Sequence, residues 1–155
     1  NLQALCYTCN SQKSDKDDTD FRNWKNLYEY REKDCAFCNL ERKAKSQNMF
    51  AFTIDDKYPV TKNHKLIIPR RHVRSFFELG NAEYKGVLEL LKKEKEELGR
   101  KDATISAFNV GINDGKDSGQ TIIHCHIHLI PRRKDDVSDP TGGVRGIFPE
   151  KRKYP

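Results

Sequence analysis

The chain has 155 residues and a formal net charge of +6, and charged residues make up 34% of it. This length suits one domain with a short appendage, so nothing requires a second full domain. No stretch approaches the ~20 apolar residues that a membrane span needs, and no signal-peptide pattern opens the chain. We therefore expect no membrane partner, and the positive charge favours an anionic ligand such as a nucleotide polyphosphate or a nucleic acid.

Cysteine usage indicates the compartment. Four of the five cysteines form two Cys-x-x-Cys pairs, Cys6/Cys9 and Cys35/Cys38. Such pairs favour metal ligation in a reducing environment over a secreted disulfide framework, which would favour an even count. We therefore predict a cytoplasmic protein.

The opening residues differ in character from the rest of the chain. Residues 1–13 resemble the C-terminal half of an HNH nuclease motif, in which a Cys-x-x-Cys knuckle precedes the last metal-binding residue, here Asn10. The front half of that motif is missing, so this segment alone does not assemble a nuclease site. The alternative is a linker, or a helix start capped by Asn10. Because residues 14–20 are almost entirely polar, we place a boundary there, between an N-terminal segment (1–20) and the main domain (21–155).

The main domain begins with apolar residues at helical spacing, which are Phe21, Trp24, Leu27 and Tyr28. We expect a short amphipathic helix that lays this stripe against the domain. Residues 48–54 and 64–69 then predict two strands joined by a turn around Tyr58-Pro59. We interpret His64, at the start of the second strand, as a structural histidine.

Residues 82–98 predict the one long helix. Its apolar face would contain Tyr84, Val87, Leu88, Leu91 and Leu98. Gly99 would end the helix, and the charged run 92–97 would be its solvated face. Residues 104–113 predict the next strand, which leads into a loop at 114–119.

Three of the five histidines follow that loop at strict period two, as His124, His126 and His128. Successive strand side chains alternate faces at ~3.3 Å per residue, so these three rings would share one face, with neighbours ~6.6 Å apart. A single histidine there would be an ordinary polar residue of a half-buried strand. Three in register favour a ligand site.

Several segments together carry a family resemblance. Besides the His-x-His-x-His pattern, the matching segments are Ile54-Asp55-Asp56, residues 64–73, residues 108–115, Ser118-Gly119-Gln120 and residues 142–146. From about Cys35 to Ile147 the chain resembles the histidine-triad (HIT) family, and within it the branch that contains diadenosine tetraphosphate hydrolases and phosphorylases. The resemblance implies an α+β fold, with an antiparallel sheet, one long helix on a face, and a short N-terminal helical extension. It also implies a homodimer.

The resemblance also implies a zinc site. Its structural zinc ligands would be Cys35, Cys38, His72 and His124, a chemically sound tetrahedral set. A single Cys-x-x-Cys pair is weak support for zinc, because a structural site needs four ligands. In the alternative, Cys6 and Cys9 complete an all-thiolate site with Cys35 and Cys38, and the two histidines are released.

The nucleotide contacts follow from the same resemblance. Asp56 matches the position that holds the ribose hydroxyls, although many turn aspartates only stabilise the turn. Asn113, Gly119, Gln120 and Thr121 match positions that contact the phosphate chain or the leaving oxygen. Arg145 matches a position that reaches distal phosphates or the second base, where a guanidinium suits phosphate.

A neutral imidazole is a competent nucleophile near pH 7, provided that one ring nitrogen is held as N–H. The resemblance makes His126 this nucleophile and the carbonyl of His124 its orienting group. His128 would neutralise the phosphate oxygens, and Thr121 would donate a proton to the leaving group. No catalytic divalent ion is obligatory in this scheme.

These residues predict a nucleotide hydrolase that cleaves the α-phosphate bond of dinucleoside polyphosphates or related nucleotides through a nucleotidyl-histidine. In the first alternative, a transferase or phosphorylase uses the same intermediate and phosphate enters the product. In the second, the chain is a zinc-stabilised nucleic-acid-binding or nuclease-associated module, whose binding would fall steeply with salt and survive loss of His126.

Overall fold

The computed structural model describes residues 24–153. The N-terminal segment 1–20, with Cys6, Cys9 and the HNH-like stretch, lies outside the described residues, as does Phe21. The helices and strands are α2 (Trp24–Tyr28), β1 (Ser46–Gln47), β2 (Ala51–Asp55), β3 (Lys65–Pro69), α3 (Asn81–Lys101), β4 (Ile105–Ile112) and β5 (Ile127–Arg133). Within the described range, every helix falls short of the length and apolarity that a membrane crossing requires.

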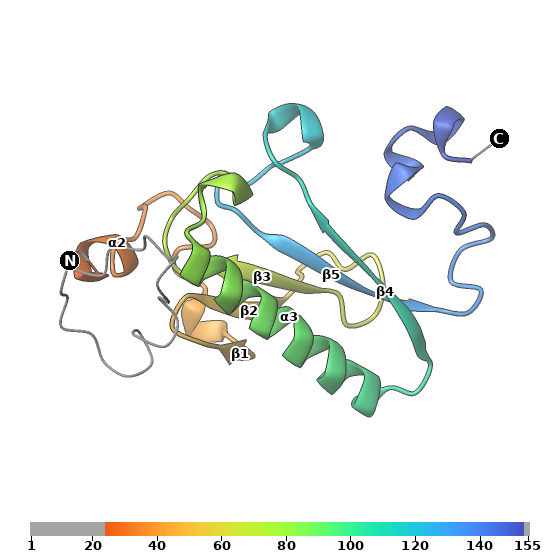
Figure 1. Ribbon diagram of the computed structural model, residues 1–155, viewed down its shortest axis with the longest axis horizontal. Coiled ribbons are helices and arrows are strands. Elements are labelled where there is room, and N and C mark those ends of the chain that lie inside the picture. Colours follow the sequence, from red (N-terminus) through yellow and green to blue (C-terminus); the bar gives the residue numbers. More distant parts are fainter. Residues whose placement is uncertain (1–23, 154–155) are drawn as a thin grey trace.

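The strands form one sheet in the order β1-β2-β3-β5-β4, and every neighbouring pair is antiparallel. Helix α3 runs across one face of this sheet (Figure 1). The predicted α+β architecture, an antiparallel sheet with one long helix on a face, is therefore confirmed.

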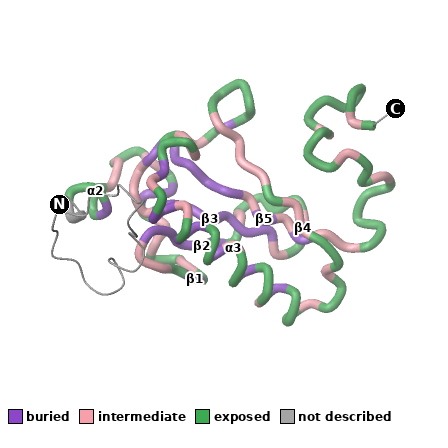
Figure 2. Tube along the Cα trace, viewed as in Figure 1, coloured by how far each residue is buried: buried purple, intermediate pink, exposed green. Residues whose placement is uncertain are grey.

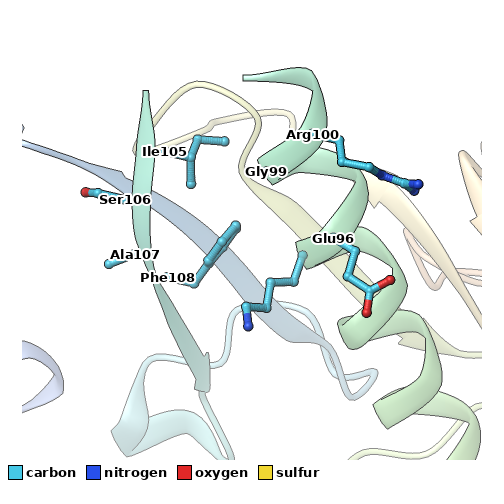
Figure 3. Close-up of a pocket in the computed structure, with 8 residues that line it drawn as sticks. Glu96, Gly99, Arg100, Ile105, Ser106, Ala107 and Phe108 are labelled. Atoms are coloured by element: carbon cyan, nitrogen blue, oxygen red, sulfur yellow. The ribbon is translucent and has the colours of Figure 1, made fainter. Parts of the chain in front are cut away.

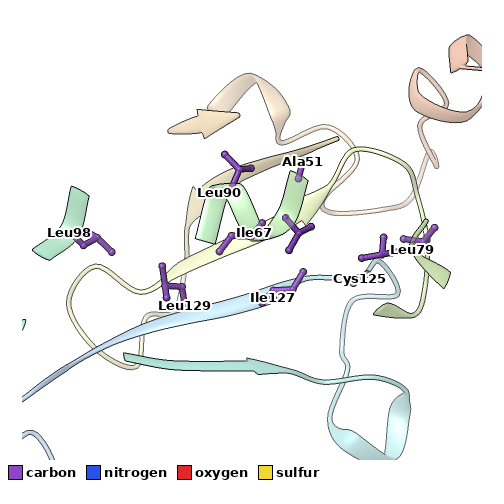
Figure 4. Close-up of a cluster of buried hydrophobic side chains, with 10 residues drawn as sticks. Ala51, Ile67, Leu79, Leu90, Leu98, Cys125, Ile127 and Leu129 are labelled. Atoms are coloured by element: carbon purple, nitrogen blue, oxygen red, sulfur yellow. The ribbon is translucent and has the colours of Figure 1, made fainter. Parts of the chain in front are cut away.

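Both faces of the central strands are buried. On the α3 face, alternate residues of the strands, such as Ala51, Ile67 and Ile127, meet Val87 and Leu90 of the helix (Figure 4). On the opposite face, a second core contains Phe37, Phe52, Ile54, Leu66 and Ile68. This double burial explains why β2 and β3 read as almost continuous apolar runs, and both are mostly buried in Figure 2.

Successive side chains of β5 alternate between the α3 core and the opposite face of the sheet. Ile127 and Leu129 point into the α3 core. His128 therefore lies on the other face, where its neighbours in register are Leu66 of β3 and Gly111 of β4. The face away from α3 is the one that presents the histidine.

Helix α3 is longer than predicted, because Gly99 does not end it. The backbone N–H of Asp102 still donates to the carbonyl of Leu98, so the helix continues to Lys101. Nothing crowds Gly99. A single glycine near the end costs helix stability but does not stop the hydrogen bonding.

Two residues of α3 correct the predicted faces. Leu88, predicted to be buried, is 50% exposed, and Leu90 packs into the core instead. Glu94, predicted to be solvated with the charged run 92–97, is buried and accepts a hydrogen bond from the Thr53 hydroxyl at 2.8 Å. Successive residues of a helix are ~100° apart, so Glu94 lies on the same side of α3 as Val87 and Leu90, whereas Leu88 lies outside that buried side.

Tyr28 of the short helix α2 packs against the domain. Tyr28 is buried, and its ring lies 6.0 Å from that of Phe50, edge to face. Leu27 is 40% exposed, so of the two stripe residues whose side chains the structure describes, only Tyr28 is buried.

Gly86 allows α3 to approach the sheet closely. A Cβ atom added there would lie 2.9 Å from Cβ of Phe50 and 3.2 Å from Oδ1 of Asn48. Replacement of Gly86 by alanine should lower the free energy of unfolding by about 1–2 kcal/mol, because overpacking outweighs the helix propensity of alanine. Urea unfolding followed by circular dichroism measures the change.

The same helix offers the matched control. At Gly99 an added Cβ atom meets nothing within 4 Å. Gly99→Ala should therefore raise the free energy of unfolding by about 0.5–1 kcal/mol. Equal effects of the two substitutions would contradict this account of Gly86.

Candidate active site and metal centre

The four predicted zinc ligands lie together. Ligand atoms of Cys35, Cys38, His72 and His124 all lie within 4.8 Å of one another. The Sγ atom of Cys35 is 3.4 Å from Nδ1 of His124, and Sγ of Cys38 is 3.3 Å from Nδ1 of His72. Residues separated by up to 89 positions in the chain thus converge on one point.

The chemistry of this cluster fits a zinc ion. A tetrahedral ion with Zn–S bonds of ~2.3 Å and Zn–N bonds of ~2.1 Å sets sulfur and nitrogen ligands about 3.6 Å apart. Nε2 of His124 lies 2.9 Å from the carbonyl of Pro69 and donates to it, which leaves Nδ1 with its lone pair toward the sulfurs. Burial raises the pKa of Cys38 to about 11, so ligation would release a thiol proton.

A partly buried ion pair anchors the residue next to His72. The neighbouring residue, Arg71, donates to Glu83 of α3 through Nε at 2.9 Å and Nη2 at 2.6 Å. The side chain of Glu83 is almost fully buried, and it also accepts the backbone N–H of Gly80. This bidentate contact fixes the segment after β3 to the start of α3.

His126 is oriented by the main chain. Its Nδ1 lies 2.8 Å from the carbonyl oxygen of His124 and donates to it. Nε2 therefore carries the lone pair. The Phe37 ring packs edge to face against His126 at 5.0 Å between centroids, and 6% of the residue's surface remains exposed.

The predicted single histidine strand is wrong in part. Strand β5 begins at Ile127, so His124 and His126 precede it. The chain bends at residues 122–124, and the backbone N–H of Cys125 donates to the carbonyl of Val73 at 2.7 Å, outside the sheet register. As a result the rings of His126 and His128 lie 5.1 Å apart instead of ~6.6 Å, and the side chain of His124 enters the cysteine cluster.

His64 belongs to the site, although its sequence position suggested a structural role. Its Nε2 lies 3.0 Å from Nδ1 of His128, and its Nδ1 lies 3.4 Å from Oδ2 of Asp56. Burial lowers the pKa of His64, and burial together with the adjacent histidines lowers that of His128 to about 4. Pairing of β3 with β5 brings the two histidines together, so the period of one strand did not reveal this contact.

The predicted phosphate-binding residues occupy one loop. Gly119 has φ +90°, which glycine adopts without strain, and an added Cβ atom there would lie 3.9 Å from Nδ2 of Asn113. Gln120 is buried, donates to the carbonyl of Arg74 and accepts the N–H of Gly115, both at 2.8 Å. Its amide therefore holds the loop in shape.

Thr121 lies on the outer side of the metal cluster. It is exposed and lines a cavity of about 550 Å³ together with Cys35 and His72. Cys35 and His72 are both predicted zinc ligands.

Two predicted nucleotide contacts have other partners within this chain. Oδ1 of Asp56 accepts the backbone N–H of Tyr58 at 2.8 Å, as in a turn. Arg145 donates to the carbonyl of Lys151 at 2.9 Å, in the segment Gly143–Ile147. That segment lies beyond the C-terminal end of β5, away from the start of β5 where the histidines are (Figure 1).

Comparisons with known proteins agree with this geometry. A model of the HIT domain matches residues 44–135. The bis(5'-nucleosyl)-tetraphosphatase (asymmetrical) of Schizosaccharomyces pombe is 38% identical over 81 residues, which are 52% of this chain and 44% of that protein. An adenosine 5'-monophosphoramidase of the same organism is 26% identical over 66% of this chain and 77% of its own. A Zn-bound histidine triad family protein from Mycobacterium smegmatis has a TM-score of 0.61 at 26% identity, over 66% of this chain and 78% of that one.

The antiparallel sheet, the long helix on one face and the clustered histidines at the other define a histidine-triad domain. The chain belongs to the HIT family, since the family model covers more than half of it. It spans less than half the length of the S. pombe tetraphosphatase. The resemblance of residues 1–13 to an HNH motif receives no support from these comparisons.

Proposed function

We propose that this chain is a nucleotide hydrolase that cleaves the α-phosphate bond of dinucleoside polyphosphates or related nucleotides through a nucleotidyl-histidine. The single observation that carries the proposal is the 2.8 Å hydrogen bond from Nδ1 of His126 to the carbonyl of His124. It fixes the neutral tautomer in which Nε2 is the nucleophile. The HIT relatives support the substrate class.

In the proposed reaction, the lone pair of His126 Nε2 attacks the α-phosphorus, and the bond from phosphorus to the leaving nucleotide oxygen breaks. Thr121 is the proposed proton donor to that oxygen. Water then attacks the same phosphorus, the bond to His126 breaks, and a nucleoside monophosphate leaves. The exposed edge of His126 is small, so the Phe37 ring has to shift for a phosphate to reach Nε2.

His128 has a defined part in this scheme. With its pKa lowered, its ring is neutral at pH 7. We assign it a hydrogen bond to the phosphate oxygens, donated from Nε2, rather than a positive charge. Asp56 remains the proposed ribose contact, Asn113, Gly119 and Gln120 the proposed phosphate loop, and Arg145 the proposed contact to distal phosphates.

We assign a structural zinc ion to Cys35, Cys38, His72 and His124, whose spacing suits it. Zinc bound there would cross-link the segment with Cys35 and Cys38 to the sheet. The catalytic steps are assigned to the chain's own residues.

We also propose a homodimer. Strand β4 is an edge of the sheet, and much of it is exposed. Beside it, a cavity of about 610 Å³ separates β4 from the C-terminal half of α3, lined by residues such as Glu96, Arg100 and Phe108 (Figure 3). An unpaired edge with an adjacent groove suits a second copy of this chain.

The test is incubation with labelled diadenosine tetraphosphate, followed by an acid-free quench and mass spectrometry of the protein and the products. We expect an adenylyl group on His126 and release of AMP. An adduct on another residue, or no cleavage, would reject the assignment. Repeating the reaction in orthophosphate separates the alternatives, because a phosphorylase would produce ADP.

A further inference from the structure

We propose that Asp56, His64 and His128 form a second metal site, which binds a divalent transition-metal ion such as Zn²⁺ or Co²⁺. These residues are distinct from the four ligands of the cysteine cluster. They come from the turn after β2, the start of β3 and the middle of the β3–β5 pair.

The three side chains already have nearly the spacing of a coordination sphere. One ligand atom from each lies within 4.8 Å of the others. Oδ2 of Asp56 is 3.4 Å from Nδ1 of His64 and 3.9 Å from Nδ1 of His128. Nitrogen and oxygen ligands ~2.0–2.1 Å from a tetrahedral ion lie about 3.4 Å apart. The distance from Asp56 to His64 already has this value, and the distance from Asp56 to His128 exceeds it by about 0.5 Å.

The hydrogen bonds indicate which ring nitrogens carry lone pairs. The backbone N–H of Val60 donates to Nδ1 of His64 at 3.4 Å, so Nε2 of that ring carries the hydrogen and donates to Nδ1 of His128. Nδ1 is therefore the ligand atom in both rings, and both Nδ1 atoms lie beside the Asp56 carboxylate. A bound ion would replace these two hydrogen bonds, and its charge would be matched by the carboxylate.

The donor set selects the kind of ion. Two neutral imidazoles and one carboxylate suit zinc and its neighbours in the transition series, whereas magnesium and calcium prefer oxygen ligands alone. Burial and the neighbouring histidines hold His128 neutral at pH 7, with a pKa of about 4, and burial lowers the pKa of His64 too. Neither ring then has to lose a proton to bind the ion.

An ion at this site would compete with a nucleotide. Under the proposed function, Asp56 contacts the ribose and His128 the phosphate, and the ion would occupy both side chains. The second site would therefore be inhibitory. This consequence rests on the proposed function, whereas the binding of the ion does not.

The test counts ions. The full chain carrying Cys6→Ser and Cys9→Ser, which removes the sulfur donors outside the described residues, is dialysed against Co²⁺ and analysed for metal per chain. We expect about two ions in this parent, and about one after a further Asp56→Asn or His64→Gln substitution. Cobalt bound by thiolates has its own charge-transfer absorption, so the spectrum identifies the ion that is lost. AMP should release the same ion.

The neighbouring carboxylate provides the matched control. Asp55 is paired with Lys65 at 2.5 Å and Lys45 at 3.5 Å, away from the two histidines. Asp55→Asn should keep both ions. One ion in the parent, or the same loss in Asp55→Asn as in Asp56→Asn, would overturn the second site and leave a hydrogen-bonded histidine pair. Because ion counts need no turnover, this result is independent of whether the chain is a hydrolase.

Discussion

Replacement of His126 by asparagine should lower turnover of diadenosine tetraphosphate by roughly 10⁴-fold or more, because the nucleophile is lost. The fold should persist. The amide nitrogen of asparagine can still donate to the carbonyl of His124, which His126 reaches at 2.8 Å. Initial rates of the purified variant measure turnover, and circular dichroism measures whether the fold persists.

The control for this substitution is the preceding residue. Cys125 is equally buried, but its side chain lies in the α3 core. Cys125→Ala should change the rate only a few-fold, with some loss of stability from the smaller side chain. A rate within tenfold of the parent for His126→Asn would contradict the nucleophile assignment.

Replacement of Cys38 by serine should remove the structural zinc and lower the free energy of unfolding by about 4 kcal/mol. Cys38 is buried, and its Sγ atom lies 3.3 Å from Nδ1 of His72 and 3.7 Å from Nδ1 of His124. The side chain of serine is a poor zinc ligand, so the remaining three ligands would bind the ion weakly. Elemental analysis measures the zinc content, and urea unfolding with and without a chelator measures the free energy of unfolding.

The zinc content also distinguishes the set Cys35, Cys38, His72 and His124 from the all-thiolate set, in which Cys6 and Cys9 replace the two histidines. If His72 is a ligand, His72→Asn lowers the zinc content, and Cys6→Ser does not. In the all-thiolate alternative the outcomes are reversed. Cys125→Ala again serves as control, since it should leave the zinc content unchanged. Full zinc content in Cys38→Ser would refute both sets.

Local sequence patterns located the individual elements β2, β3, β4 and α3, whereas the antiparallel sheet came from the family resemblance. Apolar runs between turn residues marked the strands, and helical spacing marked α3, although not every residue of its buried face. The proposed zinc ligands and the proposed roles of His126 and Asp56 came from the family resemblance, since His72 and Cys38 are far apart in the chain and no local spacing connects them.

What local patterns missed depends on contacts between elements. The pairing of His64 with His128 requires the register of β3 on β5, which no single strand encodes. Burial of Glu94 depends on Thr53 lying opposite it across the helix–sheet interface. The irregular backbone before β5, where Cys125 donates to Val73 outside the sheet register, is likewise not encoded by the spacing of the histidines.

His124 serves two neighbours through different atoms. Its imidazole lies with Cys35 and Cys38, while its carbonyl oxygen accepts the hydrogen of the His126 ring. An ion bound at the cysteine cluster would add a restraint to the side chain of this residue. Through one residue's backbone, that restraint would extend to the ring proposed to attack the nucleotide.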